Sequence, residues 1–237
     1  MRRLVFGSLV VTAAFVALTA GSVTAGRTWD GCTTGSGDVR FRAADGTRLV
    51  GHRFGRGRIG IVLAHQRPGN LCQWWSYSKR LAGLGYLAFP FDLRNYGQSQ
   101  TRRYRSGEGP GVDVAAAVNL VRRLGAKKVF LVGASLGGSA VLAGGATVRP
   151  QVDGVVSVSG AADLANAIES VPRLHAPALF LAGKYDVDFA AEAQRLYDAT
   201  GSSDKTLKIL LRGEHGTQLA GASLSARRLI ESFVATH

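Results

Sequence analysis

Short apolar runs alternate along this chain with segments of helical periodicity, and this alternation is the strongest constraint on its fold. Residues 59–64 and 129–132 are continuous apolar runs, the pattern of strands covered on both faces. Residues 74–84 place apolar side chains at helical spacing and end before a glycine. The expected strands are 39–43, 48–54, 59–64, 86–91, 128–132, 152–158, 178–182 and 207–211. A hairpin followed by repeated strand–helix units predicts an α/β protein whose mostly parallel central sheet has about eight strands, with helices on both faces.

The N-terminal residues have the pattern of a leader. Arg2 and Arg3 form a basic start, no charged residue occurs over 4–26, and small residues precede Ala25. We expect a signal peptide cleaved after Ala25, and therefore a secreted, periplasmic or cell-envelope protein. The alternative is an uncleaved N-terminal membrane anchor, since the uncharged stretch is nearly long enough to span a bilayer. The expected organisation is signal peptide 1–25, linker 26–38 and one domain over 39–237.

The chain is strongly basic, with 29 Lys and Arg against 16 Asp and Glu and a formal net charge of +13. These cations are scattered along the sequence and form no dense block interleaved with aromatic residues, so we expect no nucleic-acid partner. Two interpretations remain: peripheral contact with anionic envelope surfaces, or a solvated surface rich in arginine. The second is favoured, because net charge governs solubility and non-specific association more than any particular site. We expect a monomer.

The chain has two cysteines, Cys32 and Cys72. In an exported protein an even cysteine count indicates a disulfide, and two cysteines permit one pairing. The bridge would join the N-terminal segment to the region after the strand 59–64. Two unpaired thiols in a reducing compartment are the alternative.

Ser135 lies in Gly133-Ala134-Ser135-Leu136-Gly137, directly after an apolar run and before the small residues of a helix start. The pentapeptide alone is weak evidence, because about 0.3 matches to G-x-S-x-G would arise by chance in a chain with this much glycine and serine. Its position is more informative. A tight strand-to-helix turn needs small flanking residues and places the serine hydroxyl at a helix N-terminus, which favours developing negative charge.

Two further reactive side chains follow predicted strands. Asp186 comes after the strand 178–182, and His215 comes after the strand 207–211. Ligands of open parallel sheets bind at the carboxyl ends of the strands, so Ser135, Asp186 and His215 are expected at the same edge. Serine, carboxylate and histidine in this chain order are typical of one large hydrolase family and differ from the chymotrypsin and subtilisin orders.

From residue 39 to the C-terminus, the chain resembles the α/β-hydrolase family, without a large cap domain because fewer than about 20 residues separate the strands at 152–158 and 178–182. The resemblance rests on the five segments His65–Pro68, Asp92–Ser99, Gly133–Gly137, Gly183–Asp186 and Glu214–Gly216. Gln66 and Asn95 stand where the family usually has glycine. Glycine permits backbone angles that a glutamine resists, so Gln66 bears on the conformation of His65–Pro68, which corresponds to the oxyanion segment of the family.

The resemblance implies a role for each residue. Ser135 would be the nucleophile, His215 its base, and Asp186 the group that orients the imidazole. The backbone N–H groups of Leu136 and Arg67 would form the oxyanion hole. Gln66 is an alternative second donor and a candidate pocket residue. Trp74 is either a pocket residue or part of the core.

Some residues compete with the expected acid and base. Asp188 and Asp163 are rival acids, but Asp186 lies where the acid turn leaves its strand. His65 is expected to have a structural role within the oxyanion segment. The other rival histidines, which fall in a hairpin strand, a short connection and the C-terminus, are His52, His175 and His237.

The sequence therefore predicts an exported serine hydrolase that cleaves small-molecule or lipid carboxylic esters through an acyl-enzyme. A peptidase, thioesterase or dienelactone-type hydrolase using the same triad is an alternative, because specificity lies in loops grafted on the fold. A non-catalytic envelope-binding homologue is another. We expect no cofactor and no metal, since the histidines are dispersed and carry no ligand spacing.

Overall fold

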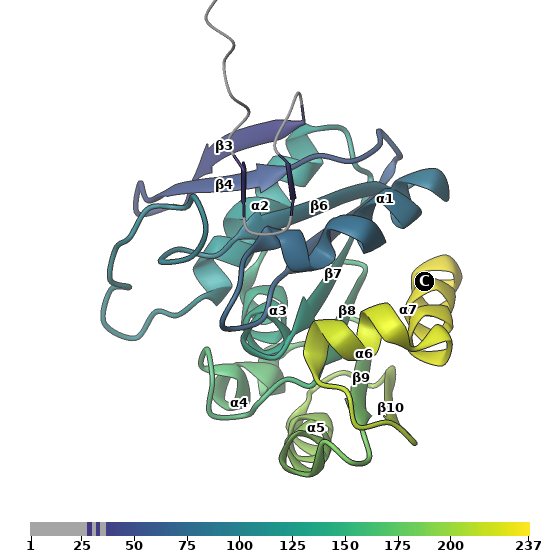
Figure 1. Cartoon of the computed structure of the whole chain (residues 1–237). Helices are drawn as coiled ribbons and strands as arrows, with labels where there is room; N and C mark the ends of the chain where they lie inside the picture. The colour runs from purple at the N-terminus through teal and green to yellow at the C-terminus, as the bar shows by residue number, and fades with distance from the viewer. Residues whose placement is uncertain (1–27, 30–31, 34–36) are drawn as a thin grey trace, which may run out of the picture.

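The structure is a computed structural model that describes residues 28–29, 32–33 and 37–237. Its centre is an eight-stranded sheet with the order β10-β9-β8-β7-β5-β6-β4-β3 (Figure 1). The strands are β3 (Asp38–Arg42), β4 (Arg48–His52), β5 (Ile59–Ala64), β6 (Leu87–Asp92), β7 (Lys128–Ala134), β8 (Gly154–Val158), β9 (Ala178–Gly183) and β10 (Lys205–Leu210). Only β4 pairs antiparallel, with β3 and β6. The mostly parallel sheet that the apolar runs predict is confirmed.

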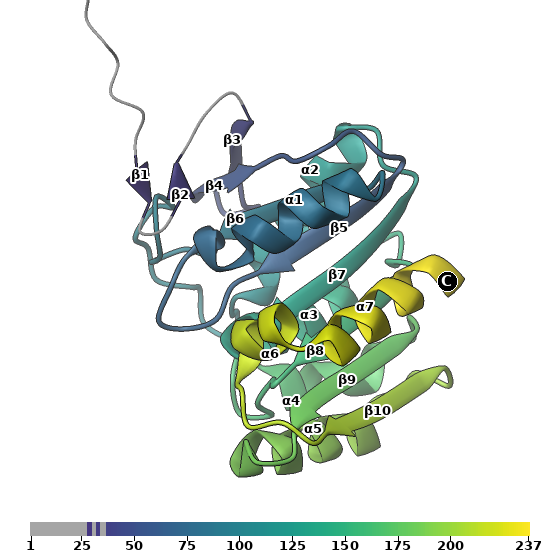
Figure 2. The same ribbon diagram turned by 45° about the vertical axis from the view of Figure 1, so that its right-hand side comes forward.

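Helices cover both faces of this sheet (Figure 2). The helices are η1 (Leu71–Trp74), α1 (Trp75–Gly83), α2 (Gly111–Arg123), α3 (Leu136–Thr147), α4 (Ala167–Ser170), η2 (Val171–Arg173), α5 (Val187–Ala199), α6 (Gly216–Ala222) and α7 (Leu224–Thr236). One core joins the sheet to α1, α6 and α7, and the other joins it to α2, α3 and the α4–η2 segment. Strands β5 and β7, at the centre of the sheet, are buried on both faces, which explains why their sequences are nearly continuously apolar.

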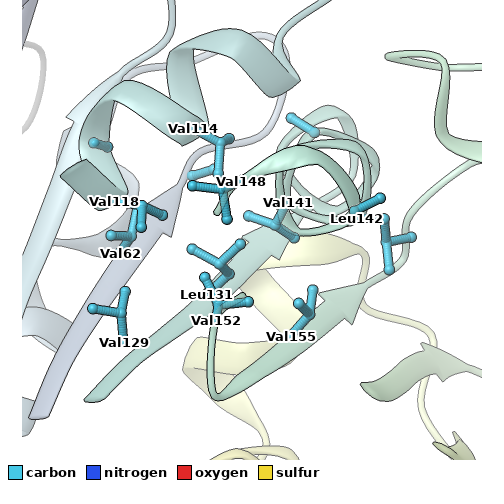
Figure 3. Close-up of a cluster of buried hydrophobic side chains, with 14 of the residues drawn as sticks. Val62, Val114, Val118, Val129, Leu131, Val141, Leu142, Val148, Val152 and Val155 are labelled. Carbon is cyan, nitrogen blue, oxygen red and sulfur yellow. The ribbon is translucent and has the colours of Figure 1, made fainter. Parts of the chain in front are cut away.

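The larger core is built from aliphatic side chains of the sheet, α2 and α3 (Figure 3). Val114 and Val118, one turn apart on α2, belong to this core together with Val62 of β5. Helix α3 contributes Val141 but is otherwise composed mostly of small residues, and nearly all of it is buried. These small residues allow α3 to lie close to the centre of the sheet.

Two sequence-based expectations about elements need correction. The second expected strand ends at His52, because Phe54 makes only an isolated antiparallel bridge with Ala88. The short helix α6 was not anticipated, since its glycine-rich sequence has no helical stripe. Between β8 and β9 only α4 and η2 occur, so no large cap is inserted there, as expected.

A long loop from residue 93 to 110 is held to the sheet by Arg94. Its fully buried guanidinium donates to Asp113 at 2.7 Å and to Asp45, in the β3–β4 turn, at 2.8 Å. The ring of Tyr104 covers the guanidinium at 4.2 Å. Burial by itself raises the pKa of Asp45, but hydrogen bonds from Thr47 and Arg94 outweigh it and hold that pKa well below its usual range.

The N-terminal part of the described chain is fastened by a disulfide between Cys32 and Cys72. Cys32 belongs to a separate strand pair of β1 (Thr28–Trp29) and β2 (Cys32–Thr33). The disulfide packs with Val50 of β4 and Leu71. Among the described residues, no helix is both long and apolar enough to cross a membrane.

Removing the disulfide should destabilise the fold. The bond joins residues 40 positions apart. Cross-linking a loop of that length reduces the conformational entropy of the unfolded chain, which stabilises the folded state by about 2–4 kcal/mol. We expect Cys32→Ala/Cys72→Ala to lower the free energy of unfolding by that amount in urea titrations. The oxidised wild type is the reference. Equal stability of the two proteins would contradict a cross-link that restrains the unfolded chain.

Candidate active site

Ser135 occupies a strained turn between β7 and α3. Its φ of 49° and ψ of −117° lie in a region that non-glycine residues rarely adopt. The strain comes from close packing around the turn. A Cβ on Gly133 would collide with the carbonyl of Gly137, and a Cβ on Gly137 would collide with the carbonyl of Ala64 at the end of β5. Positions 133 and 137 therefore both require glycine, because any side chain there would overlap with neighbouring backbone atoms.

The hydroxyl of Ser135 stands at the N-terminus of α3 without capping it. The residue is largely buried, with 7% of its surface exposed. The N–H of Leu136 belongs to the first turn of α3, where backbone donors have no partner within the helix. A negative charge forming beside Ser135 would meet this donor and the positive end of the helix dipole.

Asp186 and His215 form a hydrogen-bonded pair. His215 Nδ1 lies 2.7 Å from Asp186 Oδ2, and the two side chains are 28% and 13% exposed. Asp186 lies three residues after the end of β9 and immediately precedes α5, and His215 immediately precedes α6. The ring of Phe189, one turn into α5, packs against the imidazole with centroids 4.1 Å apart. With Nδ1 donating to the carboxylate, Nε2 is left as an acceptor.

Ser135 and His215 lie on neighbouring segments of backbone. A Cβ placed on Gly216 would lie 3.5 Å from the Cβ of Ala134. No hydrogen bond joins Ser135 Oγ to His215 within the described part of the chain. The structure thus brings the acid and the histidine into contact, and it places the segment that carries His215 next to the segment that carries Ser135.

The rival residues lie elsewhere. Asp163 is 76% exposed and pairs with Arg195, and Asp188 is exposed on α5. His52 pairs with Asp38 in the β3–β4 hairpin at 2.7 Å. The remaining two histidines bond to residues away from the turn that carries Ser135: His175 to Gly201 and His237 to Asp204.

His65, at the end of β5, is fully buried beneath the oxyanion segment. Nδ1 lies 2.9 Å from the carbonyl of Gln66, and the N–H of Leu93 donates to Nε2 at 3.1 Å. These partners assign the proton to Nδ1 and leave the ring neutral. Burial lowers the pKa of His65 to about 4. The ring therefore joins the ends of β5 and β6, which is a structural role.

Gln66 ties the oxyanion segment to the segment that carries His215. Its Oε1 accepts from the N–H of Thr217 at 2.7 Å and from Thr217 Oγ1 at 3.0 Å. Its Nε2 donates to Gln218 at 3.1 Å. Its own N–H donates to Gln73 Oε1, so this group is occupied and Arg67 has the remaining N–H of the segment. Gln66 is a buried tie between two segments, a different position from the pocket wall considered above.

The N-terminus of α6 is capped by residues from other strands. His215 provides no side-chain cap to α6. Instead Gly216 N–H donates to the hydroxyl of Ser159, just past β8, at 3.1 Å, and Thr217 N–H donates to Gln66. Two of the free donors of a first turn are thereby satisfied. Sequence reasoning missed Ser159, whose one available signal was its place directly after a buried strand.

Trp74 is a core residue. Its side chain is 1% exposed, and its indole N–H donates to the carbonyl of Ala64 at 2.9 Å. The burial leaves no face of the ring to line an open pocket. The other departure from the family pattern, Asn95, adopts a φ of 71°, which asparagine tolerates better than most residues. In the described part of the chain no group of side chains is arranged to hold a metal ion.

Acid should weaken the fold through His65. The unfolded chain accepts a proton near the ordinary histidine pKa of 6.5, whereas the folded chain resists it until about pH 4. His65 therefore contributes stability above pH 6.5 that is lost as the pH falls towards 4, about 3 kcal/mol over the whole range. Asp92 acts in the opposite sense. Burial raises its pKa to about 6, so its protonation favours the folded state as the pH falls.

A comparison of wild type with His65→Gln isolates the histidine, because Asp92 is present in both proteins. We expect the stability of the wild type relative to the variant to fall by about 2 kcal/mol between pH 7 and pH 4.5, measured by urea unfolding at each pH. A difference that stays constant with pH would contradict a buried neutral ring.

Comparison with known proteins agrees with this architecture. A family model described as the alpha/beta hydrolase fold matches residues 61–197, more than half of the chain. No curated protein matches the chain. An esterase of Pyrococcus furiosus superposes with a TM-score of 0.71 at 16% identity, covering 84% of this chain and 91% of that one. An enol-lactonase from Burkholderia xenovorans gives 0.68 at 15% identity, with coverages of 83% and 100%.

A monoacylglycerol lipase of Paleococcus ferrophilus gives a TM-score of 0.64 at 19% identity, covering 80% of this chain and 99% of that one. At these low sequence identities, the similarity to the three structures shows only that the fold is shared. The fold and the family match agree, and the chain belongs to the α/β-hydrolase family.

Proposed function

We propose that this chain is an exported serine hydrolase that cleaves carboxylic esters through an acyl-enzyme, with Ser135, His215 and Asp186 as its triad. The observation that carries the proposal is the hydrogen-bonded Asp186–His215 pair beside a strained serine at a helix N-terminus. Structures with the same fold include an esterase, a lipase and a lactonase, all named for ester-type substrates. Ester hydrolysis is therefore favoured over peptide or thioester hydrolysis.

The mechanism follows from the roles of the three side chains. His215 Nε2 takes the proton of Ser135 Oγ as this oxygen attacks the ester carbonyl carbon, and Asp186 stabilises the imidazolium. The N–H groups of Leu136 and Arg67 stabilise the oxyanion of the tetrahedral intermediate. His215 then protonates the leaving alcohol, and water attacks the acyl-enzyme by the same route. The first step needs a hydrogen bond between Ser135 Oγ and His215 Nε2, and hydrogen bonds between a nucleophile and its base often tighten only when substrate binds.

Export is supported by the sequence of residues 1–25 and by the disulfide. Disulfides form and persist in oxidising compartments outside the cytosol, and the Cys32–Cys72 bond fastens the start of the domain. Cleavage of the leader and a monomeric state belong to the same proposal.

Ser135→Ala should abolish the reaction with a fluorophosphonate probe, because the probe phosphonylates an activated serine. The variant should also lower kcat on a short-chain ester by a factor of about 10⁴ or more. Ser76→Ala, on the exposed surface of α1, is the matched control and should keep full labelling. An unlabelled wild type, or labelling that survives in Ser135→Ala, would refute the proposal. Parallel thioester and anilide substrates distinguish the alternative hydrolases.

Gln66 should act as a positioning residue for His215. Gln66→Met keeps the volume and removes the hydrogen bonds to Thr217 and Gln218, so the turn that carries His215 loses its tie. We expect kcat to fall by about 10- to 100-fold with little change in KM, because small misplacements of a catalytic group are costly. Gln194→Ala, at an exposed helical position, is the control. Wild-type kcat in Gln66→Met would show that only the volume at this position matters.

A further inference from the structure

Positive charge is concentrated at one end of the central sheet. Residues 38–105, from β3 to the loop after β6, contain thirteen Lys and Arg but three Asp and no Glu. This stretch accounts for +10 of the chain's formal net charge of +13. Figure 1 shows β3 and β4 at the opposite extreme of the sheet from β10. The excess of cations over acids thus comes mainly from the half of the sheet that contains β3, β4, β5 and β6.

The three acids of this stretch are all engaged. Asp38 pairs with His52 at 2.7 Å. Asp45 is almost fully buried against Arg94. Asp92 is fully buried and accepts two backbone N–H groups, each at 2.8 Å. None of the three is available to neutralise an exposed arginine.

The exposed arginines gather into a basic surface, which we define as Arg40, Arg42, Arg48 and Arg102. Arg42 and Arg48 are direct partners in the antiparallel β3–β4 ladder, and Arg40 lies two residues along on the same face. Like charges placed opposite each other destabilise a sheet. Within the described residues, none of the four guanidinium groups pairs with a carboxylate. Arg42 and Arg102 donate instead to the backbone carbonyls of Gly46 and Asp45, so no carboxylate neutralises these four charges.

The loop after β6 completes this surface. Arg48 N–H donates to Gln100 Oε1 at 3.1 Å, and Arg102 donates to the carbonyl of Asp45 in the hairpin turn at 2.9 Å. A hollow of about 490 Å³ lies between the hairpin and the loop, and its walls include Arg40 and Arg48. The basic surface is thus both charged and concave.

The N-terminal segment joins the domain at the same end. The disulfide of Cys32 packs against Val50 of β4, and Val50 is the ladder partner of Arg40. Figures 1 and 2 show β1 and β2 beside β4 and β6. The N-terminal end of the described domain and the basic surface therefore lie at one end of the molecule.

We propose that the basic surface docks the protein on an anionic lipid bilayer, with the guanidinium groups bound to headgroup phosphates. Arginine presents its N–H groups as a planar fork that matches phosphate oxygens. Each cation near an anionic membrane surface raises the partition coefficient about fivefold. A bilayer is the occupant because its surface supplies many phosphates to arginines spread over a hairpin and a loop. This inference is independent of the proposed hydrolase activity.

Co-sedimentation of the full chain with vesicles tests the docking. We expect binding to vesicles containing about one third phosphatidylglycerol, weakening as salt screens the charges, and much weaker binding to phosphatidylcholine alone. Arg40→Gln/Arg42→Gln/Arg48→Gln should lower the partition coefficient on the order of 100-fold. Its melting temperature should not fall, because the substitution relieves repulsion in the β3–β4 ladder.

The matched control removes the same number of charges from the far edge of the sheet. Arg173→Gln/Arg195→Gln/Lys208→Gln alters exposed residues of η2, α5 and β10 and should leave the partition coefficient within about threefold of wild type. Equal weakening by both triple variants would overturn oriented docking. Equal binding to neutral and anionic vesicles would also overturn it, as would capture by soluble polyphosphate without vesicle binding.

Discussion

The close contact of β5, β7 and the start of α3 is the constraint on which the rest of the structure depends. Gly133 and Gly137 bring backbone against backbone, with the carbonyl of Ala64 in the space that a side chain would need. Because α3 can then lie near the centre of the sheet, Ser135 is forced to a φ of 49° at a helix N-terminus. The same contact sets the end of β5, and with it the oxyanion segment, beside the serine. Geometry and reactivity at the proposed nucleophile share one steric cause.

The proposed base, His215, is located by contacts that come from three strand ends. Asp186 follows β9 and orients the imidazole of His215, while Ser159 past β8 and Gln66 past β5 cap the helix that begins after the histidine. A short glycine-rich helix has little intrinsic stability, so its position depends on these partners. Gln66, which stands where the family usually has glycine, therefore has a structural role at the start of α6. Its side chain occupies the space that links the proposed oxyanion hole to the proposed base.

Charge in this protein is sorted by burial. Acids near the β3–β4 edge are held inside the fold or in tight pairs, as with Asp45 on Arg94, whereas the arginines of the hairpin remain outside. An arrangement that leaves Arg42 opposite Arg48 reduces the stability of the ladder and creates a strong local field. The proposed lipid surface and the proposed catalytic edge would then be separate features of one domain, served by different strands.

The sequence by itself determined the fold class, because short apolar runs that alternate with helical segments indicate strands covered on both faces, and the structure confirms the eight-stranded sheet. It also indicated Ser135, Asp186 and His215 as candidates, since local motifs at strand ends are readable one segment at a time. Only the tertiary structure decided that Trp74 belongs to the core, that α6 exists, and that Gln66 bonds to a residue 151 positions away. The contact of Arg102 with the β3–β4 turn was likewise decided by the tertiary structure. These features depend on which distant segments are brought together, and local sequence patterns carry no information about such pairings.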